Sequence, residues 1–145
     1  MSFQSYITYG YGICTDDISG VTVERLNRLL EHAPKTRESI VHYFRNHNIS
    51  KPSVEDYYAP FSLGLAELLE TVIREVNGIS LCACQNYDGD NFLLYQPCYP
   101  WEMNNVDYSL TTECLDALYR KYINLVGGCW LHTSDIFYCS VENGG

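Results

Sequence analysis

The spacing of apolar residues between positions 65 and 76 constrains the fold more than any other feature of the sequence. Apolar side chains recur at i, i+3, i+4, i+7, i+8 and i+11, namely at Leu65, Leu68, Leu69, Val72, Ile73 and Val76. This period places them on one face of an α-helix. Ser62 precedes the run, and Gly78 is a residue type that commonly follows a helix. We therefore expect a helix after Ser62 that ends at Gly78 and buries one face.

Three further segments have helical character. Residues 22–32 place their apolar side chains on one face, and residues 36–46 begin with Thr36, a suitable N-cap. A last helix is predicted to begin near Ser109 or Thr111 and to stop at the Gly-Gly pair of residues 127–128. We expect residues 47–61, which contain two prolines, to form a connecting loop.

A β-hairpin is predicted around Asp88-Gly89, a dipeptide typical of type I′ turns. Residues 79–87 and 91–99 flank this turn and have the composition of strands. The length of the loop decides which face of the second strand carries Cys98. A two-residue loop places Cys98 opposite Ile79, whereas a three-residue loop places it opposite Ser80.

Residues 3–13 and 136–141 also have the composition of strands, and two glycines in the first of them are expected to weaken or bulge it. The predicted order is therefore β-α-α-α-β-β-α-β. Residues 1–145 then form a single α+β domain, with the helices packed on one face of a small, mostly antiparallel sheet.

The charge of the chain is unevenly distributed. Eighteen acidic residues against nine basic ones give a net charge of −9, and residues 75–145 hold nine of the acids but only two bases. Phosphate binding needs cations, so this half is not suited to nucleic acid, and we expect the chain to have no direct nucleic-acid partner. An acidic surface rich in tyrosine suits a basic protein partner. Alternatively, the 13 tyrosines fill the edge of the core and the acids keep the protein soluble.

The candidate partner-binding residues are acids of this half and aromatic residues near them in the sequence. They are Glu75, Asp88, Asp90, Glu102, Asp107, Glu113, Asp116, Tyr87, Tyr95, Tyr99 and Trp101. Among them, Asp88 and Asp90 are the strongest candidates, because the tip of a hairpin projects from a domain. Asp16 and Asp17 lack the spacing of a calcium-binding loop, so we expect them to serve a turn or a helix cap.

Seven cysteines are many for a chain without a recognisable secretion signal, and their odd number argues against a disulfide framework. Cys129 and His132 form a C-x-x-H pair that suits zinc. Cys82 and Cys84 lie two apart on a predicted strand and so share a face. We therefore expect a structural Zn2+ held by Cys129, His132, Cys82 and Cys84. The alternative is a set of buried thiols with a histidine at the surface.

No sequence motif indicates catalysis, since G-x-S-x-G, H-E-x-x-H and the phosphate-binding P-loop do not occur. A zinc-dependent or cysteine hydrolase remains the alternative, because His132 lies close to a thiol. The chain contains no apolar run long enough to cross a membrane, and its first residues do not resemble a signal peptide. We expect a non-enzymatic, cytoplasmic protein.

Three stretches carry a resemblance to known proteins: SYITYGYG at 5–12, LLYQPCYPW at 93–101 and SVENGG at 140–145. The chain resembles small acidic proteins of phages and mobile elements of Gram-positive bacteria, some of which look like anti-CRISPR inhibitors of the type II-A Cas9 nuclease. The resemblance implies stoichiometric binding to Cas9, impeded loading of target DNA and action in the host cytoplasm. It also implies a possible structural zinc. A phage accessory protein with another partner is the remaining alternative.

Overall fold

The computed structural model describes residues 6–96, 111–127, 129–130 and 137–143, with the backbone alone described for 6–9, 129–130 and 137–143. Its elements, in chain order, are β1 (Tyr6–Cys14), a 3-10 turn η1 (Thr15–Asp17), β2 (Ile18–Ser19), α1 (Val23–Glu31), α2 (Pro34–Asn46), α3 (Val54–Tyr58), α4 (Leu65–Asn77), β3 (Cys82–Gln85), β4 (Asn91–Tyr95), α5 (Thr112–Val126), β5 (Cys129–Trp130) and β6 (Phe137–Asn143).

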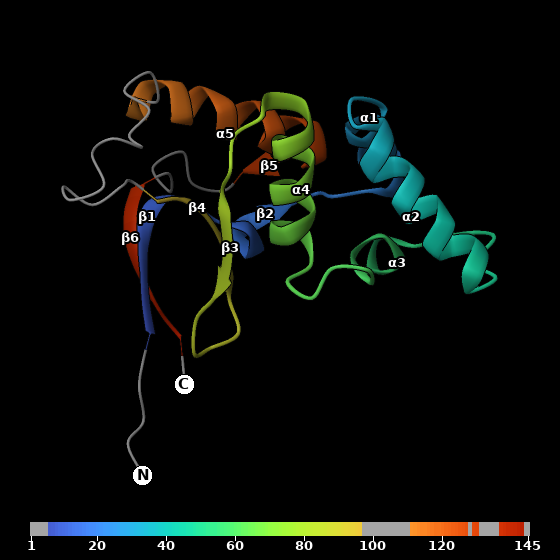
Figure 1. The fold of residues 1–145 in the computed structure, drawn as a ribbon, viewed down its shortest axis with the longest axis horizontal. Helices are drawn as coiled ribbons and strands as arrows, with labels where there is room; N and C mark the ends of the chain where they lie inside the picture. The colour runs from blue at the N-terminus through green and yellow to red at the C-terminus, as the bar shows by residue number, and fades with distance from the viewer. Residues whose placement is uncertain (1–5, 97–110, 128, 131–136, 144–145) are drawn as a thin grey trace, which may run out of the picture.

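The strands form two antiparallel sheets. The larger has the order β3-β4-β1-β6, and the smaller pairs β2 with β5. Helices α4 and α5 lie against the larger sheet, while α1, α2 and α3 extend the molecule away from it (Figure 1). The predicted α+β class is confirmed, and the order of the main elements broadly agrees with the prediction.

Four details differ from the sequence-based expectations, the first being the short strands β2 and β5, which the predicted order does not contain. The predicted loop 47–61 contains the short helix α3, which begins with a capping box between Ser53 and Asp56. The hairpin loop is longer than either predicted alternative, because Gln85 pairs with Asn91 and five residues lie between them. Gly10 and Gly12 both pair in register with β6, and Gly12 also pairs in register with β4, so neither forms a bulge among these described residues.

The core lies between the sheet and the helices. Ile13 and Leu93, which pair across β1 and β4, are 2% and 0% exposed. The apolar faces of α4 and α5 pack over this side of the sheet, and six residues of α4 are buried. Burial of this continuous apolar face is the main stabilising contribution. Within the described residues, no helix is both long and apolar enough to cross a bilayer.

Buried tyrosines join the elements through their hydroxyl groups. Tyr11 donates to the Asp116 carboxylate at 2.6 Å, and Tyr119 donates to the backbone oxygen of Tyr11 at 2.8 Å. Tyr57 on α3 similarly donates to Asn27 on α1 at 2.6 Å. These bonds satisfy hydroxyl groups that burial would otherwise leave without partners. For these tyrosines the core interpretation is therefore correct.

Two glycines allow β1 to approach β4 closely. An ideal Cβ at Gly12 would lie 1.9 Å from the backbone oxygen of Leu93, and one at Gly10 would lie 2.8 Å from that of Tyr95. A side chain at either position would therefore push the two strands apart. The sheet also curls, since Cα atoms of its edge strands β3 and β6 come within 8 Å of each other. Glycine at these positions therefore permits the close packing of two strands rather than a turn.

Replacing Gly12 by alanine should destabilise the fold strongly. The new methyl group would overlap backbone atoms of β4, which cannot move without breaking the ladder. Overpacking of this kind costs about 3 kcal/mol. We expect the urea-unfolding midpoint of Gly12→Ala to fall accordingly, while Ser39→Ala on the exposed side of α2 leaves it nearly unchanged. Equal midpoints for Gly12→Ala and the parent would show that the close approach is not required.

Candidate functional site

Four carboxylates and one aromatic side chain lie at the end of the sheet where β4 begins. We call this group the acidic tip: Asp16, Asp17, Tyr87, Asp88 and Asp90. The antiparallel register explains the grouping, because Cys14 at the end of β1 pairs with Phe92 at the start of β4. The residues that follow β1 therefore meet the loop that precedes β4. This loop points away from α5 (Figure 1).

Hydrogen bonds fasten η1 to the base of the hairpin loop. The backbone N–H of Asn91 donates to the Asp16 carboxylate at 3.0 Å, and the Thr15 hydroxyl donates to the backbone oxygen of Asn91 at 3.2 Å. Thr15 is only 3% exposed, whereas Asp16 and Asp17 are exposed. The Asp16 carboxylate thus anchors η1 to the hairpin loop, with the exposed Asp17 next to it in the chain.

The hairpin loop is held by Asn86. Its side-chain oxygen accepts hydrogen bonds from the backbone N–H groups of Asp88 at 3.0 Å and Asp90 at 2.9 Å. The backbone N–H of Asn86 donates to the backbone oxygen of Asp90, and Gly89 adopts a positive φ of 86°. Such Asx-type bonding suits tight turns. The loop conformation is therefore largely set before any partner binds, which reduces the ordering entropy lost on binding.

Tyr87 is the most exposed large apolar side chain among the described residues, at 61%. It lies beside Asp88 in the centre of the loop. Tyrosine has few rotatable bonds and combines an apolar ring with a polar end, which makes it a frequent anchor of protein interfaces. The acidic tip therefore offers an aromatic contact surrounded by negative charge.

The electrostatic character of the acidic tip is visible at Cys14. Burial is the main cause that raises the pKa of the Cys14 thiol to about 11, and the charges of Asp17, Asp16 and Asp90 raise it further. A hydrogen bond with the Asp16 backbone acts in the opposite direction. The tip thus has a negative potential.

Only some of the residues predicted from the sequence to bind a partner lie at the acidic tip. Asp88, Asp90 and Tyr87 are there, whereas Tyr95 is half-buried at the core and Asp116 binds Tyr11. Glu113 is exposed in the first turn of α5. Four further candidates lie outside the described residues: Tyr99, Trp101, Glu102 and Asp107.

Asp16 and Asp17 also lie at the acidic tip, whereas the sequence predicts only a role in a turn or a helix cap for them. Asp16 does bind a backbone N–H, so that expectation holds in part. The sequence analysis did not predict that β1 pairs with β4, and this pairing determines which residues lie beside the hairpin loop.

Glu75 has a structural role at the start of α2. Its carboxylate accepts hydrogen bonds from the backbone N–H groups of Lys35 at 3.0 Å and Thr36 at 2.8 Å, and from the Thr36 hydroxyl at 2.7 Å. It thereby caps a helix whose own N-cap residue, Ala33, has no side-chain acceptor. Burial works against the charged form, but hydrogen bonds from Thr36 and Lys35 outweigh it and hold the pKa of Glu75 below its ordinary value of 4.5.

The pH dependence of stability should report this cap. Because the pKa of Glu75 is lowered in the folded state, its stabilising contribution is complete above pH 4.5 and is lost as the pH falls through the lowered value. Glu75→Gln should lower the free energy of unfolding by about 1–2 kcal/mol at pH 7, and less at pH 3. Glu31→Gln, at an exposed position, is the control. A difference between parent and Glu75→Gln that is the same at both pH values would contradict the assignment.

Three of the four predicted zinc ligands lie on described strands, which belong to two different sheets. Cys82 and Cys84 share a face of β3, whereas Cys129 belongs to β5 in the other sheet and pairs through its backbone with Ser19. His132 lies outside the described residues, as does Cys98. The described side chains include no group of three or more residues suited to a metal. The structural zinc therefore stays a prediction.

Cys82 and Cys84 form a thiol pair at the edge of the sheet, next to Leu94 and Phe92. A hydrogen bond with Cys84 is the main cause that lowers the pKa of Cys82 to about 7, although burial and the charge of Glu70 oppose the shift. The Glu70 carboxylate also accepts a hydrogen bond from the Ala83 N–H at 2.7 Å, which covers an outward-facing donor of this edge strand.

Alkylation should reveal the influence of Cys84 on Cys82. We expect the rate at Cys82, followed by peptide mass spectrometry, to reach half its maximum near pH 7 because the thiolate is the reactive form. Cys84→Ala removes the hydrogen bond and should shift this midpoint upward by about one pH unit or more. Glutathione serves as the reference thiol. An unchanged midpoint in Cys84→Ala would refute the coupling.

Comparison with known proteins identifies no relative. No protein-family model matches the chain, and neither a curated protein sequence nor a solved structure is significantly similar to it.

Proposed function

We propose that this protein is a non-catalytic inhibitor that binds a basic, nucleic-acid-binding surface of the Cas9 nuclease through its acidic tip. Binding would be stoichiometric, would take place in the cytoplasm of a bacterial host and would impede the loading of target DNA. The resemblance of residues 5–12, 93–101 and 140–145 to phage and mobile-element proteins suggests the target.

The observation that carries the proposal is the grouping of four carboxylates around an exposed tyrosine on a preformed loop. The carboxylates come from two segments separated by about 70 residues, η1 and the β3–β4 loop. A cationic channel that holds phosphates can also accept carboxylates, because both ligands supply negative oxygen atoms to Arg and Lys. The carboxylates of the tip are then expected to steer association, while Tyr87 slows dissociation.

The two contributions can be measured separately by binding kinetics on immobilised Cas9. Asp88→Asn/Asp90→Asn should slow association about tenfold at low salt, with little effect on dissociation. Tyr87→Ala should instead accelerate dissociation about tenfold or more. Association of the parent should slow as salt rises, since the Debye length shortens below about 10 Å. Binding should also weaken once target DNA occupies the enzyme.

The matched control is Glu31→Gln/Glu113→Gln, which removes the same charge from two exposed helix positions away from the tip. It should leave both rates nearly unchanged. Equal slowing by the two double variants would mean that net charge, not the tip, drives association. Salt-independent binding, or equal affinity for the DNA-bound enzyme, would refute occupation of a nucleic-acid channel. Inhibition far below a one-to-one ratio would indicate an enzyme instead.

A further inference from the structure

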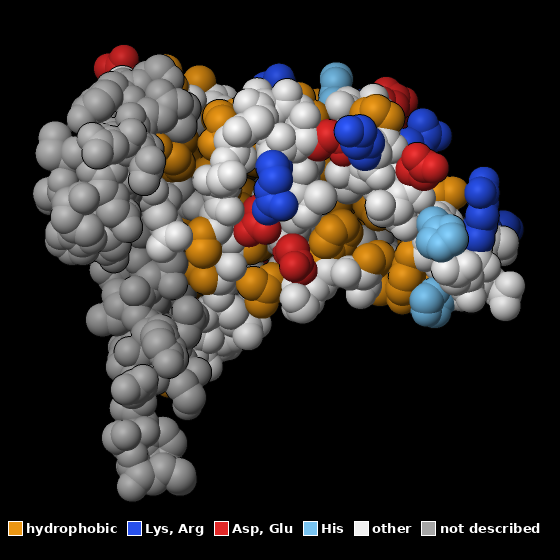
Figure 2. Space-filling view, viewed as in Figure 1, with side chains coloured by type: hydrophobic (Ala, Val, Ile, Leu, Met, Phe, Trp, Pro, Cys, Tyr) orange, Lys and Arg blue, Asp and Glu red, His pale blue; other side chains and the backbone are white. Residues whose placement is uncertain are grey.

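The cations of this acidic protein are concentrated in one short segment. Residues 34–51 contain four Lys or Arg and one acid, a net charge of +3, whereas the other 127 residues contain five Lys or Arg and 17 acids, a net charge of −12. Three of the four histidines lie in or next to this segment. Lys, Arg and His side chains accordingly gather at the end of the molecule formed by α1 and α2 (Figure 2).

Cations outside this segment are engaged within the chain. Arg28 and Arg74 form ion pairs, and Arg25 donates to the backbone oxygens of Asn124 and Gly127. Lys121 lies 5.6 Å from the centre of the Tyr122 ring. Arg25 thereby joins α1 to the end of α5, whereas the other three contacts lie within single helices and engage their cations locally.

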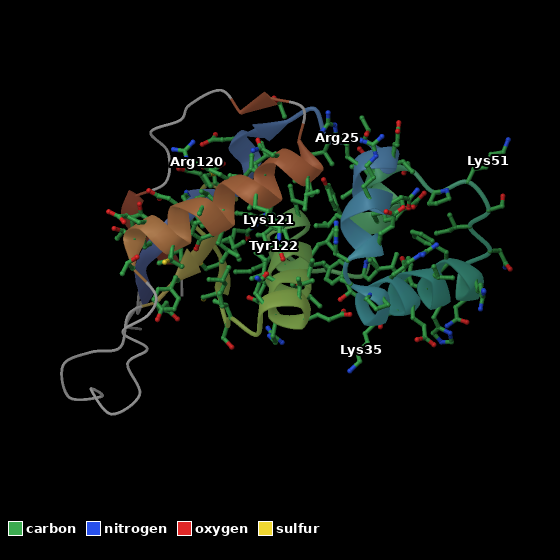
Figure 3. The ribbon with its side chains drawn as sticks, turned by 90° about the horizontal axis from the view of Figure 1, so that it is seen from above. Arg25, Lys35, Lys51, Arg120, Lys121 and Tyr122 are labelled. Atoms are coloured by element: carbon green, nitrogen blue, oxygen red, sulfur yellow. The ribbon has the colours of Figure 1, made fainter. Side chains whose placement is uncertain are left out.

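The Lys and Arg side chains of residues 34–51 make no such contacts with the part of the chain that the structure describes. We define the basic face as Lys35, Arg37, His42 and Arg45, all exposed on α2. Among the described residues, the side-chain nitrogens of Lys35, Arg37 and Arg45 make no ion pair or hydrogen bond. Figure 3 shows Lys35, and Lys51 beyond the helix, extending away from the body of the molecule.

Two adjacent grooves run along α2. The first, of about 730 Å³, is lined by the basic face together with Glu38 and Val41. The second, of about 660 Å³, lies between α2 and α4 and is lined by Ile40, Phe61 and Arg74, among others. Both grooves share Lys35 and Ser39. Cations on one side of α2 therefore lie next to a more apolar groove that contains a half-buried aromatic ring.

We propose that the basic face of α2 and the adjoining Phe61 groove bind a single-stranded nucleic acid. The phosphates would contact Arg37 and Arg45, which are about 12 Å apart along the helix axis, and a base would lie against Phe61. A cationic groove beside an aromatic side chain is the usual arrangement for single strands, whose bases are free to stack. A duplex keeps its bases within the stack, and an acidic peptide supplies no repeated planar group for the second groove.

This inference goes beyond the proposed inhibition and does not depend on it. The expectation that the chain avoids nucleic acid was based on residues 75–145, whereas α2 belongs to the other half. The net charge of −9 does not prevent local binding, because charges are screened beyond about 8 Å at physiological ionic strength. The acidic tip lies next to the larger sheet, and α2 extends away from that sheet (Figure 1).

Fluorescence anisotropy with labelled DNA and RNA oligonucleotides of about 20 bases tests the proposal. The parent should bind with a Kd of about 10⁻⁴–10⁻⁶ M, and binding should weaken as salt rises. Arg37→Glu/Arg45→Glu should weaken it about tenfold or more. Glu38→Gln, which removes the only carboxylate of the first groove, should strengthen binding about threefold. This gain cannot result from unfolding.

The matched control compares Arg45→Glu with Lys121→Glu, an exposed lysine on α5. Only Arg45→Glu should weaken binding. An equal loss in both, or no binding by the parent, would overturn the proposal. Tighter binding of a labelled glutamate peptide than of the oligonucleotides would overturn it in favour of an acidic protein partner. Self-association in sedimentation that Arg45→Glu abolishes, without oligonucleotide binding, would overturn it in favour of a second copy.

Discussion

The close approach of β1 and β4 is the constraint on which the rest of the structure depends. Backbone atoms of β4 occupy the space that a Cβ at Gly12 would need, so the two strands can pair in this register only with glycine there. That register places the end of β1 beside the start of β4 and brings η1 to the hairpin loop. It also positions Tyr11, through which α5 is bonded to the sheet. One strand contact thus determines both the core and the acidic tip.

The acidic residues divide into two groups with different roles. Glu70 and Glu75 are turned inward, where one covers an edge donor of β3 and the other caps α2. Asp88 and Asp90 instead accompany an exposed tyrosine on a rigid loop. The basic residues divide in a similar way, since Arg25, Arg28 and Arg74 are bonded within the chain, whereas the cations of α2 project into solvent. Two exposed surfaces of opposite charge follow from this division, on different elements of one small fold.

Local patterns in the sequence predicted the elements better than their arrangement. The helix of Leu65–Asn77 was predicted because its six apolar residues recur at helical spacing, which is a local signal. Helix α3 was missed because it has little more than one turn, although Ser53 and Asp56 carry the capping box in the sequence. The hairpin was located correctly, but the length of its loop was underestimated, because hydrogen bonds to the Asn86 side chain stabilise a longer turn. The joining of Asp16 with Asp90, and the use of Glu75 as a distant cap, depend on strand and helix pairing, which no local pattern encodes.

The central claim is that the acidic tip is the surface that contacts a cationic partner. Hydrogen–deuterium exchange of the complex with nucleic-acid-free Cas9 tests it most directly, because the backbone N–H groups of Asp88 and Asp90 donate to the side chain of Asn86 in an exposed loop. The account predicts slower exchange in residues 15–17 and 86–91 on binding, with unchanged exchange in α2. Protection confined to α2, or to any segment other than these two, would contradict it.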